Sequence, residues 1–274
     1  MSSIAAAGRS GVLDLMGRAR QGIETAGRLV VLALETIRYL ATDIIGRRFS
    51  WEEFILQCSF MTRVALLPTI LVSIPFGVII SVQIGAVASQ IGATSFIGAV
   101  NGTGVLQQGA PLVTSLLIAG AVGSAITSDL GARTVREEID ALKVMGISPV
   151  QRLVAPRLLA ALLISFLLTI IVAVTAMLTG YVLVVGGGQV SSGAYLGSFV
   201  SFSNPTDLYV AEFKALVFGF LATIVCCHKG LTAKGGPKGV ADAVNQAVVL
   251  SVILLAFANV LITEAYVLLI PQKI

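Results

Sequence analysis

The chain has 274 residues, of which 56% are hydrophobic and only 12% are charged, and its mean hydropathy is +0.96. Soluble domains carry about a quarter charged residues, and a soluble fold of this size could not hide so much apolar side chain. Most of the chain is therefore expected to lie in lipid. The net charge of +4 is modest, and no basic patch is interleaved with aromatic residues, so nucleic acid is not an expected partner.

The first 60 residues are predicted to form a separate N-terminal region, cytoplasmic or interfacial, ahead of a membrane domain at 61–274. Charge recurs every few positions over 11–48, which excludes a membrane span there. Apolar residues with loosely helical spacing alternate with arginines, which favours two interpretations. The segment is either a basic amphipathic helix in the cytoplasmic interface or a helix packed on this protein or a neighbouring subunit. The N-terminus lacks the apolar core of a signal peptide.

Uncharged gaps mark the expected spans, because charge is costly in hydrocarbon and about 20 apolar residues cross it as a helix. The gap at 64–128 is too long for one span, and its middle, SQIGATSFIGAVNGTG, predicts a polar connection at 91–107. The gap at 158–206 predicts a span followed by a Gly/Ser-rich loop at 186–206. The fold class is therefore an all-α integral membrane protein, with five spans near 64–90, 108–130, 153–185, 207–228 and 241–270.

The distribution of Lys and Arg predicts the orientation. Eight precede the first span, five lie in 131–157 and three lie in HKGLTAKGGPK, which together are 16 of the 18. Five alternating spans put all of them on one side. The expected topology is a multi-pass protein of the plasma (inner) membrane with a cytoplasmic N-terminus and an outside C-terminus.

The segment at 131–157 holds 8 of the 32 charged residues between two apolar segments. Val135, Ile139, Leu142 and Met145 recur at helical steps, and the other faces carry charge. Gly146 and then Pro149 predict a helix stop followed by a new start. Arg152 and Arg157 are expected at the level of the lipid headgroups. The segment thus predicts a short amphipathic cytoplasmic helix.

The charges of this short helix favour a protein partner over a lipid surface. Its apolar face is narrow, and three of its charges are the carboxylates Glu137, Glu138 and Asp140. Anionic lipid attracts cations rather than carboxylates. A groove of a partner protein with basic and apolar groups fits this pattern better.

Three runs in this region, EEIDAL (137–142), MGISP (145–149) and LVAPR (153–157), closely resemble the cytoplasmic segment of the MlaE/YrbE permeases, the membrane subunits of lipid-moving ABC transporters. Pro111 followed by AGAVGSAITSDLGART agrees, as does GGPKGVADAVNQAVVLSV near the last span. The tracts SWEEFILQCSFMTRVALLPTILVSIPFG and GARTVREEIDALKVMGI are most similar to YrbE subunits of actinobacterial (mycobacterial) Mce systems. The resemblance covers most of the chain from about residue 50 onward.

This resemblance implies a permease that moves lipids, with import of fatty acids or related lipids as the expected direction. It implies a second YrbE-like chain, a separate ABC ATPase that binds ATP and Mg²⁺, and Mce proteins on the outer face. No cofactor is then bound by this chain directly. The residues implied for the coupling helix, which docks on the ATPase, are Arg136, Glu137, Glu138, Ile139, Asp140, Leu142, Lys143, Met145, Gly146 and Pro149.

Polar and small residues inside the spans are candidates for the substrate path or the subunit interface. Glu212 and Lys214 lie two apart, on different faces of one helix, so direct neutralisation of one by the other is not expected. Small residues in span two permit close helix contact, within the chain or in a dimer. Where many family members have an Arg-Glu pair, this chain has two glutamines, which favours a heterodimer. The candidates are Gln107, Gln108, Pro111, Gly120, Gly123, Glu212 and Lys214.

No nucleotide-binding motif, metal-ligand cluster or nucleophile elbow occurs in the sequence, which predicts a protein without enzymatic activity. Cys58, Cys226 and Cys227 show no metal-type spacing and are interpreted as apolar helix residues. The alternative to a permease is a membrane scaffold that anchors Mce-like partners without forming the substrate path.

Overall fold

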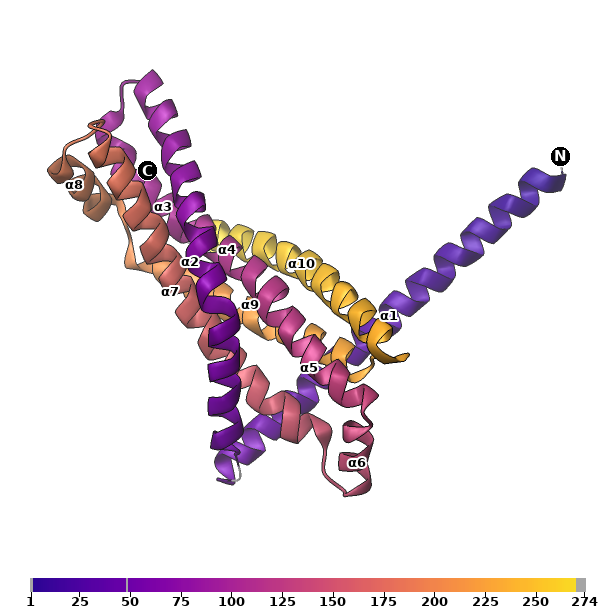
Figure 1. Cartoon of the computed structure of the whole chain (residues 1–274). Coiled ribbons are helices and arrows are strands. Elements are labelled where there is room, and N and C mark those ends of the chain that lie inside the picture. Colours follow the sequence, from indigo (N-terminus) through magenta and orange to yellow (C-terminus); the bar gives the residue numbers. More distant parts are fainter. Residues whose placement is uncertain (1, 48, 270–274) are drawn as a thin grey trace.

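A computed structural model describes the backbone of residues 2–47 and 49–269, and the side chains of those residues other than 2–21, 23 and 269. The described part is helical and contains no strand. Five helical segments in it are long and apolar enough to cross a membrane, which confirms the predicted number of spans and the fold class. The arrangement is shown in Figure 1.

The first span is α2 (Trp51–Gln90), and the second runs from η1 (Thr94–Phe96) through α3 (Ile97–Gly104), η2 (Val105–Gly109), α4 (Ala110–Leu117), η3 (Ile118–Val122) and α5 (Gly123–Val135). The third comprises η4 (Val150–Val154) and α7 (Ala155–Gly186), the fourth is α9 (Pro205–Leu231) and the fifth is α10 (Gly236–Leu269). Helix α1 (Ser2–Ile45) precedes them. Two short helices, α6 (Glu138–Val144) and α8 (Ser192–Phe202), connect spans two to three and three to four.

The alternation of the spans gives the bundle two ends, which we name after their short helices. The α6 end holds the start of α2 and the junction between α9 and α10, and the α8 end holds α3 and the end of α10 (Figure 1). The segments at 131–157 and 229–238, which carry most of the Lys and Arg beyond the first span, therefore share the α6 end.

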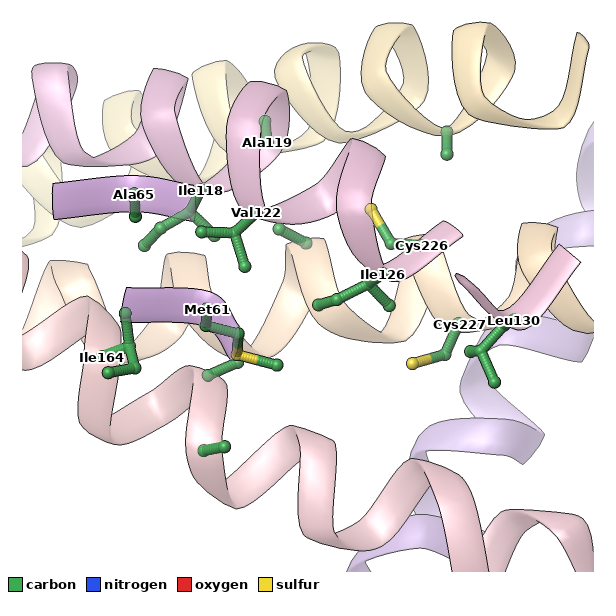
Figure 2. Close-up of a cluster of buried hydrophobic side chains, with 14 of the residues drawn as sticks. Met61, Ala65, Ile118, Ala119, Val122, Ile126, Leu130, Ile164, Cys226 and Cys227 are labelled. Atoms are coloured by element: carbon green, nitrogen blue, oxygen red, sulfur yellow. The ribbon is translucent and has the colours of Figure 1, made fainter. Parts of the chain in front are cut away.

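The largest apolar cluster lies between α2, η3, α5, α7 and α9 (Figure 2). Met61, Ile126, Leu130 and Ile164 are at most 5% exposed there. Both Cys226 and Cys227 are fully buried in this cluster as free thiols. They pack as small apolar side chains, as interpreted from the sequence.

Glycine lets α2 and α7 approach closely. A Cβ at Gly77 would lie 2.6 Å from the carbonyl oxygen of Ala176 and 2.8 Å from its Cα. Nearby, the Thr175 hydroxyl donates to Ser73 Oγ at 2.6 Å. In lipid, burial of apolar side chains does not drive helix association, because the lipid tails are equally apolar. Helices therefore associate through small residues that allow close packing and through hydroxyl groups that form hydrogen bonds.

Helix α1 packs on the bundle with its C-terminal half, which favours the second of the two interpretations of this region. Leu32 is buried against Leu158 of α7 and Ile224 of α9. The Gln151 amide donates to Asp43 Oδ1 at 2.8 Å. The N-terminal half of α1 extends away from the bundle (Figure 1), and the side chains of residues 2–21, with their predicted basic and apolar groups, lie outside the described residues.

The connection predicted at 91–107 is much shorter in the structure. Only a short turn separates α2 from the helical segment that starts at Thr94, so the prediction was wrong for most of this range. Asn101 of this segment is bonded inside the bundle: its amide nitrogen donates to Ser81 Oγ and to the Tyr195 hydroxyl, both at 2.9 Å. The loop predicted at 186–206 likewise contains α8. Its Tyr195 is 4% exposed and packs on Gly98 of α3, and burial raises the pKa of this phenol.

Candidate functional site

The α6 segment projects from one end of the bundle and is held at its root by an apolar contact. Ile139 is 4% exposed within the main cluster, and Leu142 packs against the same cluster. The charged residues of the predicted coupling helix, in contrast, are exposed: Arg136, Glu137, Glu138, Asp140 and Lys143. Its ion pairs, Arg136–Glu138 and Lys143–Asp140, are exposed and therefore contribute little to stability.

The backbone turns sharply on both sides of α6. Glu137 has φ 61°, a left-handed conformation that is unusual for a residue with a Cβ, and Gly146 has φ 74° after the helix. Pro149 then precedes η4, so the predicted stop and new start are confirmed. These turns place α6 outside the line of α5 and α7 (Figure 1).

The tip of this segment exposes apolar groups as well as charges. Val144 is 89% exposed, Met145 63% and Ile147 41%. The predicted apolar face is therefore divided, because Ile139 and Leu142 face the bundle while Met145 faces away from it. Val144 was not predicted, since sequence spacing alone places it on a charged face. Exposed apolar side chains rimmed by charge are typical of protein docking surfaces.

Directly at the base of this segment lies an ionic cluster formed by the buried residues Gln57 of α2 and Arg157 of α7 and the partly exposed Asp129 of α5. The Arg157 guanidinium pairs with Asp129 through Nη2 and donates from Nε to Gln57 Oε1 at 3.1 Å. Its side chain is 1% exposed. Arg157 therefore points into the bundle, while Arg152 is exposed and donates to Ser50 Oγ at 2.8 Å. The level of both arginines relative to the lipid headgroups stays a prediction.

A second polar cluster lies within the spans and gathers several of the predicted residues. The Lys214 ammonium donates to the backbone oxygen of Gln107 and to Thr263 Oγ1, both at 2.9 Å. The Gln107 amide donates to Asp207 Oδ1 at 3.1 Å, and the Tyr266 hydroxyl donates to the same oxygen at 2.7 Å. Gln107 thus bridges a buried cation and a buried carboxylate; Lys214 is 2% and Asp207 3% exposed.

Gln108 extends the same cluster to α10. Its amide nitrogen lies 3.4 Å from Thr263 Oγ1, and its oxygen lies 3.4 Å from Asn259 Nδ2. The sequence predicted Gln107, Gln108 and Lys214 but missed Asp207, Asn259, Thr263 and Tyr266. Asn259, Thr263 and Tyr266 are polar residues in the long apolar helix α10. Their polarity within an apolar segment was the signal that could have predicted them. The cluster joins η2, α9 and α10, three elements from three spans.

The other predicted residues lie outside this cluster. Glu212 is 8% exposed, and neither carboxyl oxygen has a hydrogen-bond partner among the described residues. Pro111 is buried near the start of α4. A Cβ at Gly123 would lie 2.7 Å from Cys226 Sγ, so Gly123 serves packing of α5 on α9 within the chain. Gly120 has no such neighbour within 4 Å.

These features define the class of protein: a multi-pass helical membrane protein with a polar cluster inside its spans and an exposed, charged helix between spans two and three. In the described part, no group of three His, Cys, Asp or Glu side chains is arranged to hold a metal ion. The exposed α6 segment is a candidate surface for a partner, and the cluster around Lys214 places polar groups within the spans.

Comparison with known proteins identifies the family. Residues 54–265 match the family described as Permease MlaE, so the chain belongs to the MlaE permease family. A probable ABC transporter permease protein of Rickettsia bellii is 30% identical over 243 residues, 89% of this chain and 92% of that protein. One of Synechocystis sp. is 33% identical over 183 residues, 67% of this chain and 70% of the relative.

A plant protein is also similar: TRIGALACTOSYLDIACYLGLYCEROL 1, chloroplastic, of Arabidopsis thaliana is 27% identical over 223 residues, 81% of this chain and 64% of that protein. The MlaE permease family predicted by resemblance is thus confirmed. The chain is a permease subunit of an ABC transporter.

Proposed function

We propose that this permease moves lipids and is driven by a separate ATPase that docks on α6. The observation that carries the proposal is the shape of the α6 segment. Its tip offers exposed carboxylates and apolar groups, while Ile139 at its root is buried in the core shared by α2, α5, α7 and α9. A force on the tip therefore acts on the spans. ATP and Mg²⁺ belong to the partner, since this sequence has no phosphate-binding loop.

Lipid is the proposed cargo because the accessible faces of the spans are apolar. An apolar pocket of about 430 Å³ lies between α2 and α3 near the α8 end, with walls that suit an acyl chain. Its lining includes Ile84, Val87, Ile91, Phe96 and Val100. The name of the Arabidopsis relative, which contains a galactolipid, supports the same class of cargo.

A second permease chain is proposed to cover the exposed faces of the first and last spans. In their most apolar windows only 28% of α2 and 17% of α10 is buried, against 67% for the second and fourth spans. Glu264 lies on the exposed face of α10, where an unpaired charge in lipid is expensive. Gln107 and Gln108 are uncharged, whereas many family members have an Arg-Glu pair at these positions. A non-identical partner chain could supply that pair, which favours a heterodimer.

The similarity of residues 50–77 and 131–147 to YrbE chains supports the finer proposals. These are Mce proteins bound at the outer face, import of fatty acids or related lipids, and a plasma (inner) membrane location. The α6 end, with its Lys and Arg, is then cytoplasmic together with the N-terminus, and the C-terminus is outside.

A pull-down of the tagged chain from native membranes tests the proposal, with identification of co-purified chains and bound lipids. We expect a nucleotide-binding subunit, a second permease chain and an enriched lipid, and lipid-stimulated ATP hydrolysis by the intact assembly. Recovery of outer-face proteins without any ATPase would contradict the proposal and support a membrane scaffold instead. A soluble co-expressed domain with the same tag serves as the control for non-specific capture.

A further inference from the structure

The ionic cluster of Gln57, Asp129 and Arg157 ties together the two ends of the segment that carries α6. Asp129 lies in α5, just before this segment, and Arg157 lies in the first turn of α7, just after it. Their ion pair closes residues 130–156 into a loop with a fixed base. A buried guanidinium without its carboxylate would be strongly destabilising, so this closure is expected to persist as the protein moves.

The third member of the cluster extends the tie to the first span. Gln57 of α2 accepts from Arg157 Nε at 3.1 Å, and its own amide donates to Glu53 Oε1 at 2.8 Å. The amide is 7% exposed and therefore has little access to competing water. Within the described part, Gln57 is the one side chain of α2 that forms a hydrogen bond with Arg157.

Apolar packing makes the same three helices and α6 one unit at this end. Ile139 of α6 shares its cluster with Leu130 of α5, Leu153 beside α7 and Met61 of α2, each at most 5% exposed. Packed interiors transmit displacement rather than absorb it, because they contain few voids. Motion of α6 should therefore carry α5 and α7 with it.

We infer that Gln57, Asp129 and Arg157 are positioning residues that make α2 follow α6 when the partner ATPase moves. Farther along, the Thr175–Ser73 hydrogen bond and the close approach at Gly77 hold α2 against α7. At the α6 end the remaining contact is apolar and not directional, so it would permit α2 to shift there. The hydrogen bond from Arg157 to Gln57 fixes the register at the α6 end. This inference rests on the proposed function, and it assigns to α2 the movement that the ATPase drives.

Substitution of Gln57 by Leu tests the inference in the complete complex reconstituted in lipid vesicles. We expect normal recovery of the ATPase, ATP hydrolysis within about twofold of the unsubstituted complex, and about tenfold less lipid moved per ATP hydrolysed. Gln57→Glu combined with Glu53→Gln, which keeps an acceptor for Arg157 and exchanges donor and acceptor in the pair with residue 53, should restore the ratio. This ratio separates a positioning role from a purely structural one, which would lower recovery and thermal stability instead.

The matched control is Arg133→Gln. Arg133 also contacts Asp129, at 3.3 Å, but both residues belong to α5, so this pair joins no two helices. We expect the control to transport normally. An unchanged ratio in Gln57→Leu, or an equal loss in Arg133→Gln, would overturn the inference.

A second measurement needs no substitution in the cluster. Spin labels at the exposed positions Leu56 of α2 and Ala141 of α6, with Cys58 replaced by Ala, report the distance between these helices. The inference predicts the same distance in the nucleotide-free and ATP-bound complex, and a clear change would overturn it. If no ATPase accompanies the unsubstituted chain, the proposed function fails; an intact complex with independent α2 movement contradicts this inference alone.

Discussion

Charge reversal at the tip of α6, by Glu137→Lys together with Asp140→Lys, is expected to release the ATPase while leaving the permease inserted. Both side chains are exposed, and Glu137 makes no ion pair with any described residue. A groove that accepts these carboxylates would then face two cations, and like charges across an interface cost several kcal/mol. We expect at least tenfold less ATPase retained per permease in a pull-down, which corresponds to about 1.4 kcal/mol.

The matched control for this variant is Glu52→Lys combined with Asp242→Lys. These carboxylates are also exposed and near the α6 end, at the starts of α2 and α10. The net charge changes by the same amount in both double variants. Retention of the ATPase by the α6 variant, or its equal loss from the control, would refute α6 as the docking site.

Replacement of Lys214 by Met is expected to abolish most lipid transport without loss of assembly. Lys214 is buried, and its ammonium is held by the Gln107 backbone oxygen and by Thr263, two uncharged partners on other spans. Lys214 forms no ion pair with a described residue, so its replacement removes a desolvated charge without leaving an opposite charge unpaired. The methionine side chain can fill a similar volume, so we expect assembly to persist and the loss to fall on transport.

We expect transport to fall by at least tenfold, about 1.4 kcal/mol, with a melting temperature equal to or above that of the unsubstituted complex. Lys229→Met is the control, because Lys229 lies on the same helix and bonds a single side chain, Gln246, at 3.0 Å near the α6 end. Normal transport by a fully assembled Lys214→Met complex would show that the cation has no functional role.

The spans were predictable because charge is excluded from hydrocarbon, and the gaps between charged residues show where lipid lies. Their ends were less predictable. Asn101 reads as a loop residue, but its amide nitrogen donates to Ser81 and Tyr195 inside the bundle. Gly98 reads as a helix breaker, but it makes room for Tyr195 of α8. In lipid, small and polar residues serve helix contact as often as turns.

The candidate site was predictable where a residue stands out from its neighbours. Lys214, Gln107 and Gln108 are polar within apolar segments, and the structure brings them together. The inward direction of the Arg157 side chain was not predictable, because a cation at the end of a span is usually expected to face the headgroups. Its partners Gln57 and Asp129 come from two other spans, so only tertiary structure shows that it points inward.

Docking of an ATPase on α6 requires that α6 face the cytoplasm. The variant Asp140→Cys places a cysteine at an exposed position of α6, and a membrane-impermeant maleimide can be applied to it in intact cells and in inside-out vesicles. Ser201→Cys of α8, which is also exposed, marks the opposite end of the bundle. We predict that residue 140 reacts only from the cytoplasmic side, and less when the ATPase is bound, while residue 201 reacts only from outside. Labelling of residue 140 from the outer face alone would contradict the topology, and with it the docking of an ATPase on α6.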